Sequence, residues 1–302
     1  MLDPQISVII NTYNSERFIH ETISSLQAQT FKEWEAIVWD NGSHDSTLEI
    51  VASFNDDRIH IFVDSEKVSL YQSRVNALHE CAGELVAFLD HDDVWLPEKL
   101  SIQKDVFQDQ DVSCSSTDVL IIRTEEFLES CVASGKRVST YSGKYVNKLQ
   151  LSKRYRVAMS SLMARRTSLL SCLPSPIPEY TIIEDFDLVF RLLSEGKLIP
   201  ISQPLTLYRL HSSNYSSQTE IYQKEVEQWL KIYDLEGSRT QLDALIGLNV
   251  WNSLLRTKAR RELQNGSRLV ALGIASNMKW GFDRAKLTVG ACLVPKQILR
   301  RL

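Results

Sequence analysis

The sequence lacks several features that mark whole classes of protein. Its five cysteines are odd in number and widely spaced, and no CxxC pair occurs. A disulfide framework or a zinc site is therefore not expected, and a reducing compartment such as the cytoplasm is. No apolar run is long enough to span a bilayer, and the start MLDPQISVII has neither the basic residues nor the long apolar stretch of a signal peptide. We therefore expect a cytoplasmic protein.

Charge and glycine patterns argue against further classes. The formal net charge is −4, so no overall basic field attracts nucleic acid, and a nucleic-acid partner is not expected. Neither GxGxxG nor GxxxxGKS/T occurs. This disfavours a dinucleotide-dependent oxidoreductase and a nucleotidyl- or phosphoryl-transfer enzyme built on a phosphate loop. The remaining composition is that of an ordinary globular protein, with 302 residues, 43% of them hydrophobic.

The first hundred residues alternate between short β-branched runs and helical patterns. This rhythm predicts an α/β fold with a mostly parallel sheet flanked by helices, and such sheets bind ligands at the carboxyl ends of their strands. The pattern predicts strands over 6–10, 36–39, 59–63 and 85–89, and helices from residue 14 or 15 to about 29, from 46 to 54, and from 69 to 82 with Gly83 as the stop.

Polar side chains follow three of these strands. Residues 12–14 follow the first strand and Asp40 ends the second. Asp90, Asp92 and Asp93 follow the fourth, where burying three carboxylates without partners would be prohibitively costly. Hard oxygen ligands at a strand end suit Mg²⁺ or Mn²⁺, which in turn suit a diphosphate. The alternative is an ordinary acidic loop.

Later segments read differently. From about 111 to 211 the pattern loosens into short strands and loops, with one amphipathic helix over 184–195 that opens on Glu184-Asp185. Beyond residue 217 the chain reads as mostly helical. We therefore predict an α/β domain over 1–217 and a helical extension over 218–302.

Four motifs now occur in order between residues 6 and 211. Together they resemble the family 2 glycosyltransferases of GT-A fold, and the whole set is far more specific than any one motif. The motifs are VIINTYN at 8–14, VWDNGSHDST at 38–47, GELVAFLDHDD at 83–93, and Glu184-Asp185 followed by YRLH at 208–211. The resemblance implies inverting transfer of a sugar from a nucleotide-diphosphate sugar to a hydroxyl. The QxxRW motif of processive synthases is absent, which favours addition of one sugar.

The resemblance also implies a donor site. Tyr13 would stack on the base, and Asp40 would accept hydrogen bonds from the base or ribose. UDP is the expected nucleotide, with dTDP and GDP as alternatives. The implied nucleotide-binding residues are Thr12, Tyr13, Asn14, Asp40, Arg74 and Asp90.

Metal and catalytic roles follow in the same way. Asp92, with Asp93 and His211 in support, would hold Mn²⁺ or Mg²⁺, which would stabilise the leaving diphosphate. Asp185 would be the general base that removes the proton of the acceptor hydroxyl, and Glu184 a second acid beside it.

Simpler interpretations of the same residues stay open. Glu184 and Asp185 are also favourable first-turn residues of a helix, His211 also fits a surface histidine, and Arg74 also fits a surface ion pair. A non-catalytic sugar-nucleotide or glycan-binding subunit would be expected to lack Asp185 or the aspartates at 90–92, and both are present.

Three residues depart from the family pattern. Asn11 stands in place of proline, Asn41 in place of the second aspartate of DDGS, and Val75 in place of asparagine. None of them removes a predicted metal ligand or the base. They bear on the nucleotide preference.

The C-terminal part is basic, with eleven Lys/Arg against two Asp/Glu between residues 246 and 302. Its last stretch, 287–302, mixes aliphatic and basic residues. This composition fits peripheral contact with an anionic membrane, where a lipid-linked glycan acceptor would be found, and equally a solvated helix face. From the family we expect a glycan or lipid-linked glycan acceptor in bacterial surface polysaccharide assembly.

Overall fold

The computed structural model describes most of the chain up to residue 233 and isolated positions beyond. The described residues are 3–64, 66–123, 136–138, 145–153, 157–173, 180–211, 219–233, 246, 249–250, 252–253, 255–256 and 271. The chain divides into two compact units, residues 1–147 with 156–214, and residues 148–155 with 215–302. The boundary predicted at 217 and the roles predicted for the two parts stay predictions.

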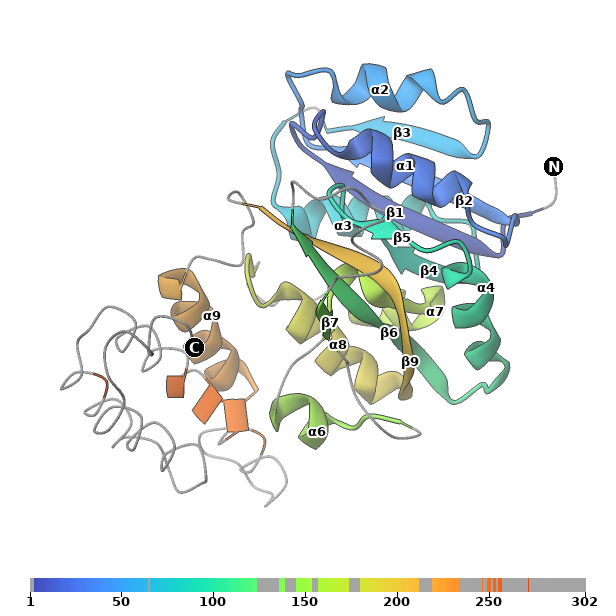
Figure 1. Ribbon diagram of the computed structural model, residues 1–302. Coiled ribbons are helices and arrows are strands. Elements are labelled where there is room, and N and C mark those ends of the chain that lie inside the picture. Colours follow the sequence, from blue (N-terminus) through green and yellow to red (C-terminus); the bar gives the residue numbers. More distant parts are fainter. Residues whose placement is uncertain are drawn as a thin grey trace. The chain divides into compact units, whose positions relative to one another are not determined.

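A nine-stranded sheet organises the first unit, in the order β3-β2-β1-β4-β8-β6-β9-β5, with β7 paired to β6 (Figure 1). The strands are β1 (Ile6–Thr12), β2 (Trp34–Asp40), β3 (Ile59–Val63), β4 (Leu85–Phe88), β5 (Val94–Trp95), β6 (Val112–Arg123), β7 (Lys136–Val138), β8 (Leu162–Arg165) and β9 (Lys197–Leu210).

The four strands predicted from the sequence form the parallel part of the sheet. β1 pairs in parallel with both β2 and β4, and β2 with β3, so their carboxyl ends share one edge. The other half is mixed: β8 runs antiparallel to β4 and β6, whereas β6 and β9 are parallel. The predicted α/β class is confirmed, whereas the sheet is mixed rather than mostly parallel, because β8, β5 and β7 each join it antiparallel.

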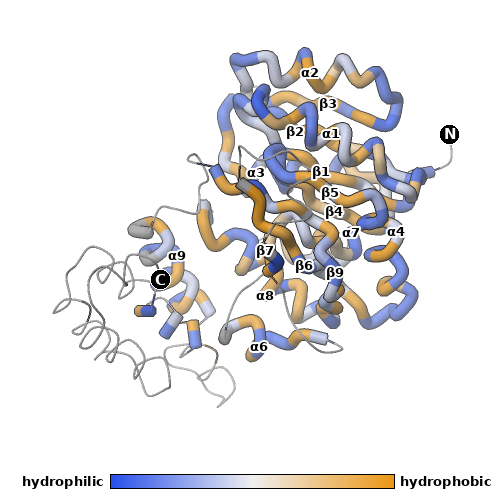
Figure 2. Tube along the Cα trace, in the orientation of Figure 1, coloured by the Kyte–Doolittle hydropathy of each residue, from blue (hydrophilic) through white to orange (hydrophobic). Residues whose placement is uncertain are grey.

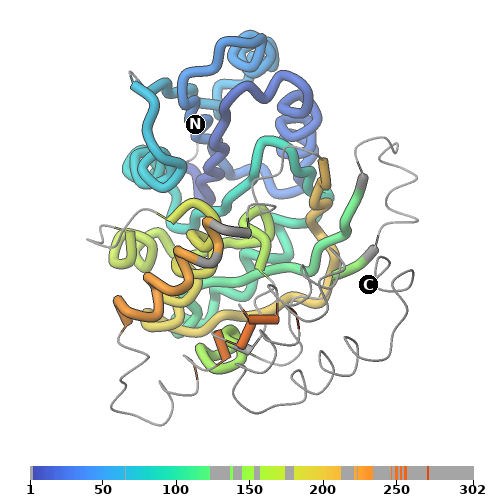
Figure 3. Tube along the Cα trace, turned by 90° about the vertical axis from the view of Figure 1, so that its left-hand side faces the viewer, coloured from blue at the N-terminus to red at the C-terminus, as the bar shows by residue number. Residues whose placement is uncertain are grey.

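Helices cover both sides of this sheet (Figure 3). α1 packs against α2, and α7 packs against both α3 and α8. The helices of the first unit are α1 (Ile19–Gln27), α2 (Thr47–Ser53), α3 (Leu70–Glu80), α4 (Lys99–Lys104), α7 (Arg166–Cys172) and α8 (Glu184–Glu195), with 3-10 turns at Asp105–Gln108 and Met159–Ser161.

The predicted start of α1 was wrong for a local reason, whereas α3 lies within two residues of its predicted bounds. α1 begins at Ile19 rather than at 14 or 15, because Asn14 adopts a left-handed φ of 49° and Ser15 starts a turn instead. α3 ends at Glu80, before Gly83. Gly83 is needed for close packing: a Cβ there would lie 2.6 Å from the backbone nitrogen of Ser7. By contrast, α8 has the predicted bounds, with Gly196 after its last residue.

The core lies between the parallel strands and α1. Alternate residues of β1, namely Ile6, Val8 and Ile10, belong to one cluster with Ile19 and Ile23 of α1. Figure 2 shows the matching hydropathy, with hydrophobic strands inside and polar loops around them. Burial of such strands on both faces explains their near-continuous β-branched runs.

The second unit contains α6 (Lys148–Lys153) and α9 (Thr219–Ile232). α9 buries Val226, Trp229 and Leu230. No helix in the described part of the chain has the length and apolarity needed to cross a membrane. The basic stretch 287–302 lies outside the described residues.

Candidate active site

The carboxyl ends of β1 and β2 are joined by two side chains predicted to bind nucleotide. Thr12 Oγ1 donates to Asp40 Oδ1 at 2.8 Å. Asp40 also accepts from the backbone nitrogen of Ser43 at 2.7 Å and from its hydroxyl at 2.5 Å. Thr12 and Asp40 are 2% and 0% exposed. Both side chains thus shape the turn after β2, and their contact with a nucleotide stays a prediction.

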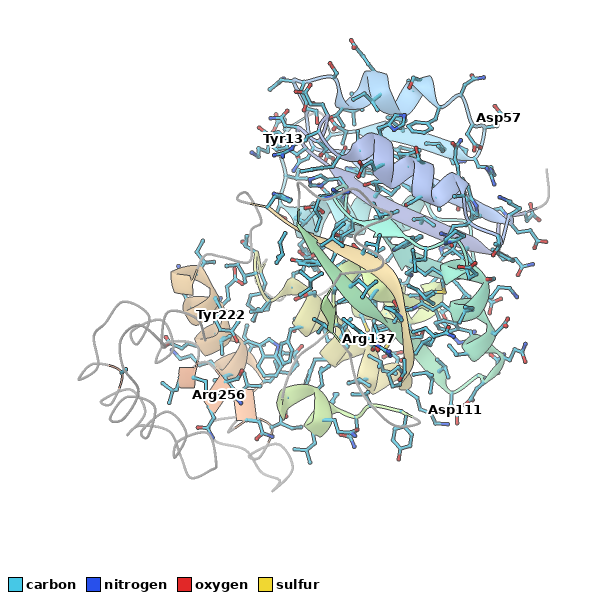
Figure 4. The ribbon with its side chains drawn as sticks, viewed as in Figure 1. Tyr13, Asp57, Asp111, Arg137, Tyr222 and Arg256 are labelled. Atoms are coloured by element: carbon cyan, nitrogen blue, oxygen red, sulfur yellow. The ribbon has the colours of Figure 1, made fainter. Side chains whose placement is uncertain are left out.

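The loop after β1 presents an aromatic ring. Tyr13 is 41% exposed, lies at the end of the sheet (Figure 4), and has the Lys67 ammonium 4.2 Å from its ring centroid. Asn14 fixes the loop, because its amide oxygen accepts from the nitrogen of His44 at 2.9 Å and its own nitrogen donates to Ser43 Oγ at 2.8 Å. Of the residues predicted to bind the base, Tyr13 is therefore the most accessible.

Asn41, one of the departures from the family pattern, has a defined structural role. Its amide nitrogen donates to the carbonyl of Val68 at 2.8 Å, and its amide oxygen accepts from the nitrogen of Val68 at 3.0 Å. An aspartate could accept but not donate, so only an amide makes both bonds. Asn41 thus holds the segment before α3 against the turn after β2.

Arg74 connects the acidic strand end to the start of α8. Its Nη1 lies 2.8 Å from Glu184 Oε1, and its Nη2 lies 3.3 Å from Asp90 Oδ1. The side chains of Arg74 and Glu184 are each 7% exposed. The alternative interpretation, a surface ion pair, is therefore wrong: Arg74 forms a largely buried bridge between two motifs far apart in the sequence, and its predicted contact with the nucleotide stays a prediction.

Burial and charge together shift the pKa values in this bridge. Burial raises the pKa of Glu184 and of Asp90, and the Arg74 guanidinium opposes both shifts. Burial alone would lower the pKa of Arg74, but Glu184 and Asp90 outweigh it and the pKa is raised. Arg74 therefore stays charged, and the two carboxylates depend on it for their ionised state.

Asp185 lies at the first turn of α8, where the helix dipole favours a carboxylate. Its Oδ1 accepts from the backbone nitrogen of Phe186 at 2.7 Å. The side chain is partly exposed, unlike the neighbouring Glu184. A carboxylate held on a helix end and reachable by a ligand can accept a proton from a bound hydroxyl.

Asp92 and His211 meet across the sheet edge, with His211 Nε2 2.7 Å from Asp92 Oδ2. Asp93 is 1% exposed, and its Oδ1 accepts from the backbone nitrogen of Arg209 at 2.9 Å while its Oδ2 has no hydrogen-bond partner. Burial, with the charges of Asp92 and Asp90, raises the pKa of Asp93 well above its usual range. Within the described residues, no three His, Cys, Asp or Glu side chains are grouped to hold a metal.

Sequence reasoning missed two residues that form hydrogen bonds with the backbone of the acidic segment 90–93 after β4. Ser160 accepts from the backbone nitrogen of Asp90 at 3.0 Å through its hydroxyl. Arg209 donates from Nε to the carbonyl of Asp92 at 2.8 Å. Arg209 is the arginine of the YRLH motif, so a signal for it was present; nothing local marks Ser160.

Comparison with known proteins decides the family. Residues 7–169 match the profile of "Glycosyl transferase family 2". The chain belongs to this family. It is a glycosyltransferase, and its fold is GT-A.

Relatives and solved structures agree with this assignment. The chain is 30% identical over 219 residues to the UDP-Glc:alpha-D-GlcNAc-diphosphoundecaprenol beta-1,3-glucosyltransferase WfgD of Escherichia coli, covering 72% of this chain and 81% of that protein. The Staphylococcus aureus TarS structure with UDP-GlcNAc has a TM-score of 0.63 at 18% identity, over 95% of this chain and 79% of that one. The Pyrobaculum calidifontis mannosyltransferase PcManGT, solved with GDP-Man and Mn²⁺, has a TM-score of 0.63 at 18% identity, over 100% and 84%. These two structures bear on the fold alone.

Proposed function

We propose that this glycosyltransferase moves one sugar from a UDP-sugar to a hydroxyl of a lipid-linked glycan, with inversion, during bacterial polysaccharide assembly. One observation supports this most: Arg74 links Asp90, at the end of β4, to Glu184, the first residue of α8 and the neighbour of Asp185. This contact supports the proposal because it brings the acidic strand end and the start of α8 together.

The substrates are proposed from relatives. WfgD, by its name, uses UDP-Glc and a GlcNAc-diphosphoundecaprenol acceptor. A second Escherichia coli glucosyltransferase with the same named donor and acceptor, WfaP, is 29% identical over 70% of this chain and 80% of its own length. A UDP-hexose and a polyprenyl-diphosphate-linked sugar are therefore the first substrates to test. An acceptor of this kind lies at the membrane surface, so peripheral contact through the C-terminal extension belongs to the same proposal.

Asp185 acts as the general base. The acceptor hydroxyl oxygen attacks the anomeric carbon, its proton passes to the Asp185 carboxylate, and the bond between that carbon and the diphosphate oxygen breaks as the new bond forms. The electron pair of the broken bond leaves on the nucleoside diphosphate. Attack from the face opposite the leaving group inverts the anomeric configuration.

Glu184 has a different place from Asp185. Its Oε1 is engaged by Arg74 and the side chain is buried. It therefore suits holding the start of α8 better than exchanging protons with substrate. Arg74 in turn opposes the rise that burial causes in the pKa of Asp90, the carboxylate proposed to face the nucleotide.

Two protein side chains, a carboxylate and an imidazole, are in place for a divalent cation that would complete its coordination with the diphosphate of the donor. One carboxylate and one imidazole converge at 2.7 Å, and the buried Asp93 beside them has an oxygen without a hydrogen-bond partner. Asp92 and His211 would hold the ion, with Asp93 in support, and a carboxylate–imidazole set suits Mn²⁺ as well as or better than Mg²⁺. When bound, the ion would neutralise charge on the leaving diphosphate.

The nucleotide would be held by Tyr13 and the turn beneath it. The exposed Tyr13 ring offers a stacking surface, and stacking on an aromatic ring contributes about 1–3 kcal/mol per base in proteins that bind single strands. Thr12, Asn14 and Asp40 would keep this loop in shape through the contacts described above.

A transfer assay tests the proposal. The purified full chain is incubated with UDP-glucose, UDP-GlcNAc, dTDP-glucose or GDP-mannose and a polyprenyl-diphosphate-linked GlcNAc, with Mn²⁺ or with EDTA. We expect product from one UDP-sugar, of inverted anomeric configuration by NMR, only when Mn²⁺ is present. Equal transfer in EDTA would refute metal dependence, and retention of configuration would refute the single displacement.

A further inference from the structure

Arg209 forms hydrogen bonds with two residues of the acidic loop after β4, residues 90–93. Its backbone nitrogen donates to Asp93 Oδ1 at 2.9 Å, and its Nε donates to the carbonyl of Asp92 at 2.8 Å. The side chain is only 5% exposed. Because Arg209 lies two residues before His211, the contacts of one residue fix both partners of the Asp92–His211 pair.

The guanidinium itself is held from α1. Its Nη2 forms an ion pair with Glu21, and its central carbon lies 4.9 Å from the Phe18 ring centroid. The Phe18 ring in turn lies 5.1 Å from the His211 ring, tilted by 33°. Phe18 therefore packs against both Arg209 and His211, and Glu21 ties Arg209 to the helix.

The same helix also supports the acidic loop directly. Thr22 Oγ1 lies 2.8 Å from the carbonyl oxygen of His91 and 2.9 Å from that of Asp93. Successive positions of α1 and the turn before it thus contact the loop on one side and the end of β9 on the other. Residues of α1 and Phe18 before it therefore contact both the segment that carries Asp92 and the strand end that carries His211.

We propose that Arg209 is a positioning residue for divalent-cation binding by Asp92 and His211, with Glu21 as its anchor. The proposal rests on the proposed metal-assisted function. Arg209 needs its fork geometry, because Nε and Nη2 point to different acceptors, and a lysine ammonium on a flexible stem reproduces neither direction. Loss of residues that orient metal ligands typically costs about 10–100-fold in metal affinity.

The test is Mn²⁺ affinity of the full chain in the presence of UDP, measured from the EPR signal of free Mn²⁺. We expect Arg209→Lys to weaken Mn²⁺ binding about 10–100-fold, and to restore most of kcat for donor hydrolysis when Mn²⁺ is raised to saturation. Glu21→Gln, which removes only the exposed anchor charge, should weaken Mn²⁺ binding less but measurably, by about 2–5-fold.

Arg58→Lys is the matched control. Arg58 also pairs with a carboxylate, Asp56 at 2.7 Å, and lies 3.7 Å from the Trp34 ring centroid, but it precedes β3 at the opposite end of the strands. It should leave Mn²⁺ affinity unchanged. Melting temperatures of all variants separate loss of fold from loss of metal binding, and Glu21→Gln carries the test if Arg209→Lys does not fold.

Two failures are distinguishable. Wild-type protein that binds Mn²⁺ while Arg209→Lys and Glu21→Gln bind it equally well would overturn the positioning role alone. Wild-type protein that binds no Mn²⁺ with UDP present would overturn the metal role in the proposed function and this inference with it.

Discussion

Arg74 and Glu184, 110 residues apart in the sequence, form a buried ion pair of 2.8 Å that ties α3 to the first turn of α8. The next residue in α8 is Asp185, the proposed base. A buried pair of this kind is costly to break, because the remaining partner keeps its charge without water or a counter-ion. The position of the base therefore depends on a contact that lies outside the reacting groups.

A double-mutant cycle tests this pair. We expect Arg74→Met or Glu184→Met alone to lower the free energy of unfolding by about 3–5 kcal/mol, and the double variant to lose far less than the sum. Urea unfolding provides the values. The exposed Lys197–Asp111 pair, 2.8 Å apart, serves as the control cycle, with a coupling of about 0–1 kcal/mol. Additive losses at Arg74 and Glu184 would show that the pair is not coupled.

Asn41 should not tolerate the aspartate that the family pattern favours there. Asn41→Asp keeps the bond from the Val68 nitrogen but sets a carboxylate oxygen against the Val68 carbonyl, which should cost about 1–3 kcal/mol of stability. Thermal unfolding of Asn41→Asp against Asn55→Asp, the same change at an exposed turn, measures it. Equal stability of the two variants would contradict the role of Asn41 in holding the segment of Val68 against the turn after β2.

The burial of Lys99 should make the stability of the protein depend on pH. It is fully buried, donates to Gln103 Oε1 at 2.6 Å, and its ammonium lies 4.1 Å from the Trp95 ring centroid. Burial lowers the pKa of Lys99 well below its usual range. Between the folded and unfolded pKa values the unfolded chain binds more protons, so this residue makes stability rise with pH.

Comparison with Lys99→Met isolates that dependence, because methionine does not titrate. From pH 7.5 to 9.5 the free energy of unfolding of the wild type should rise relative to the variant, by at most about 1.4 kcal/mol per pH unit. Urea unfolding at both pH values gives the difference. An equal change in the free energy of unfolding of the two proteins would mean that the pKa of Lys99 is not strongly lowered in the folded state.

The sequence predicted the fold best where the signal was local. The β-branched runs that became β1, β2 and β3, and the amphipathic face of α8, could be located because burial on a strand or helix leaves a short repeating pattern. The pairing of β6 with β9 brings together Val112 and Lys197. No local pattern records a contact at that separation, so the mixed half of the sheet was not foreseen.

The site divides in the same way. The aspartates at 90, 92 and 93 and the Glu184-Asp185 pair were located because they follow buried strands or open a helix. Of their partners, only His211 was placed beside Asp92, through the family resemblance. The others were not, since ion pairing depends on which side chains are brought together on folding. Thus Arg74, expected at the nucleotide, lies between two carboxylates. Arg209 of β9 contacts both Glu21 of α1 and the acidic loop after β4, which are far apart in the sequence.

The most direct test of the account compares wild type with Asp185→Asn for both donor binding and sugar transfer. An amide cannot take the proton of the acceptor hydroxyl, and general bases typically contribute about 10²–10⁴-fold to rate. We expect transfer from the UDP-sugar to fall by that factor, with UDP-sugar affinity by calorimetry within about 5-fold of wild type, since one removed charge outside the nucleotide contacts shifts binding by roughly 1 kcal/mol or less. Transfer at the wild-type rate by Asp185→Asn would contradict the assignment of the base and the mechanism built on it.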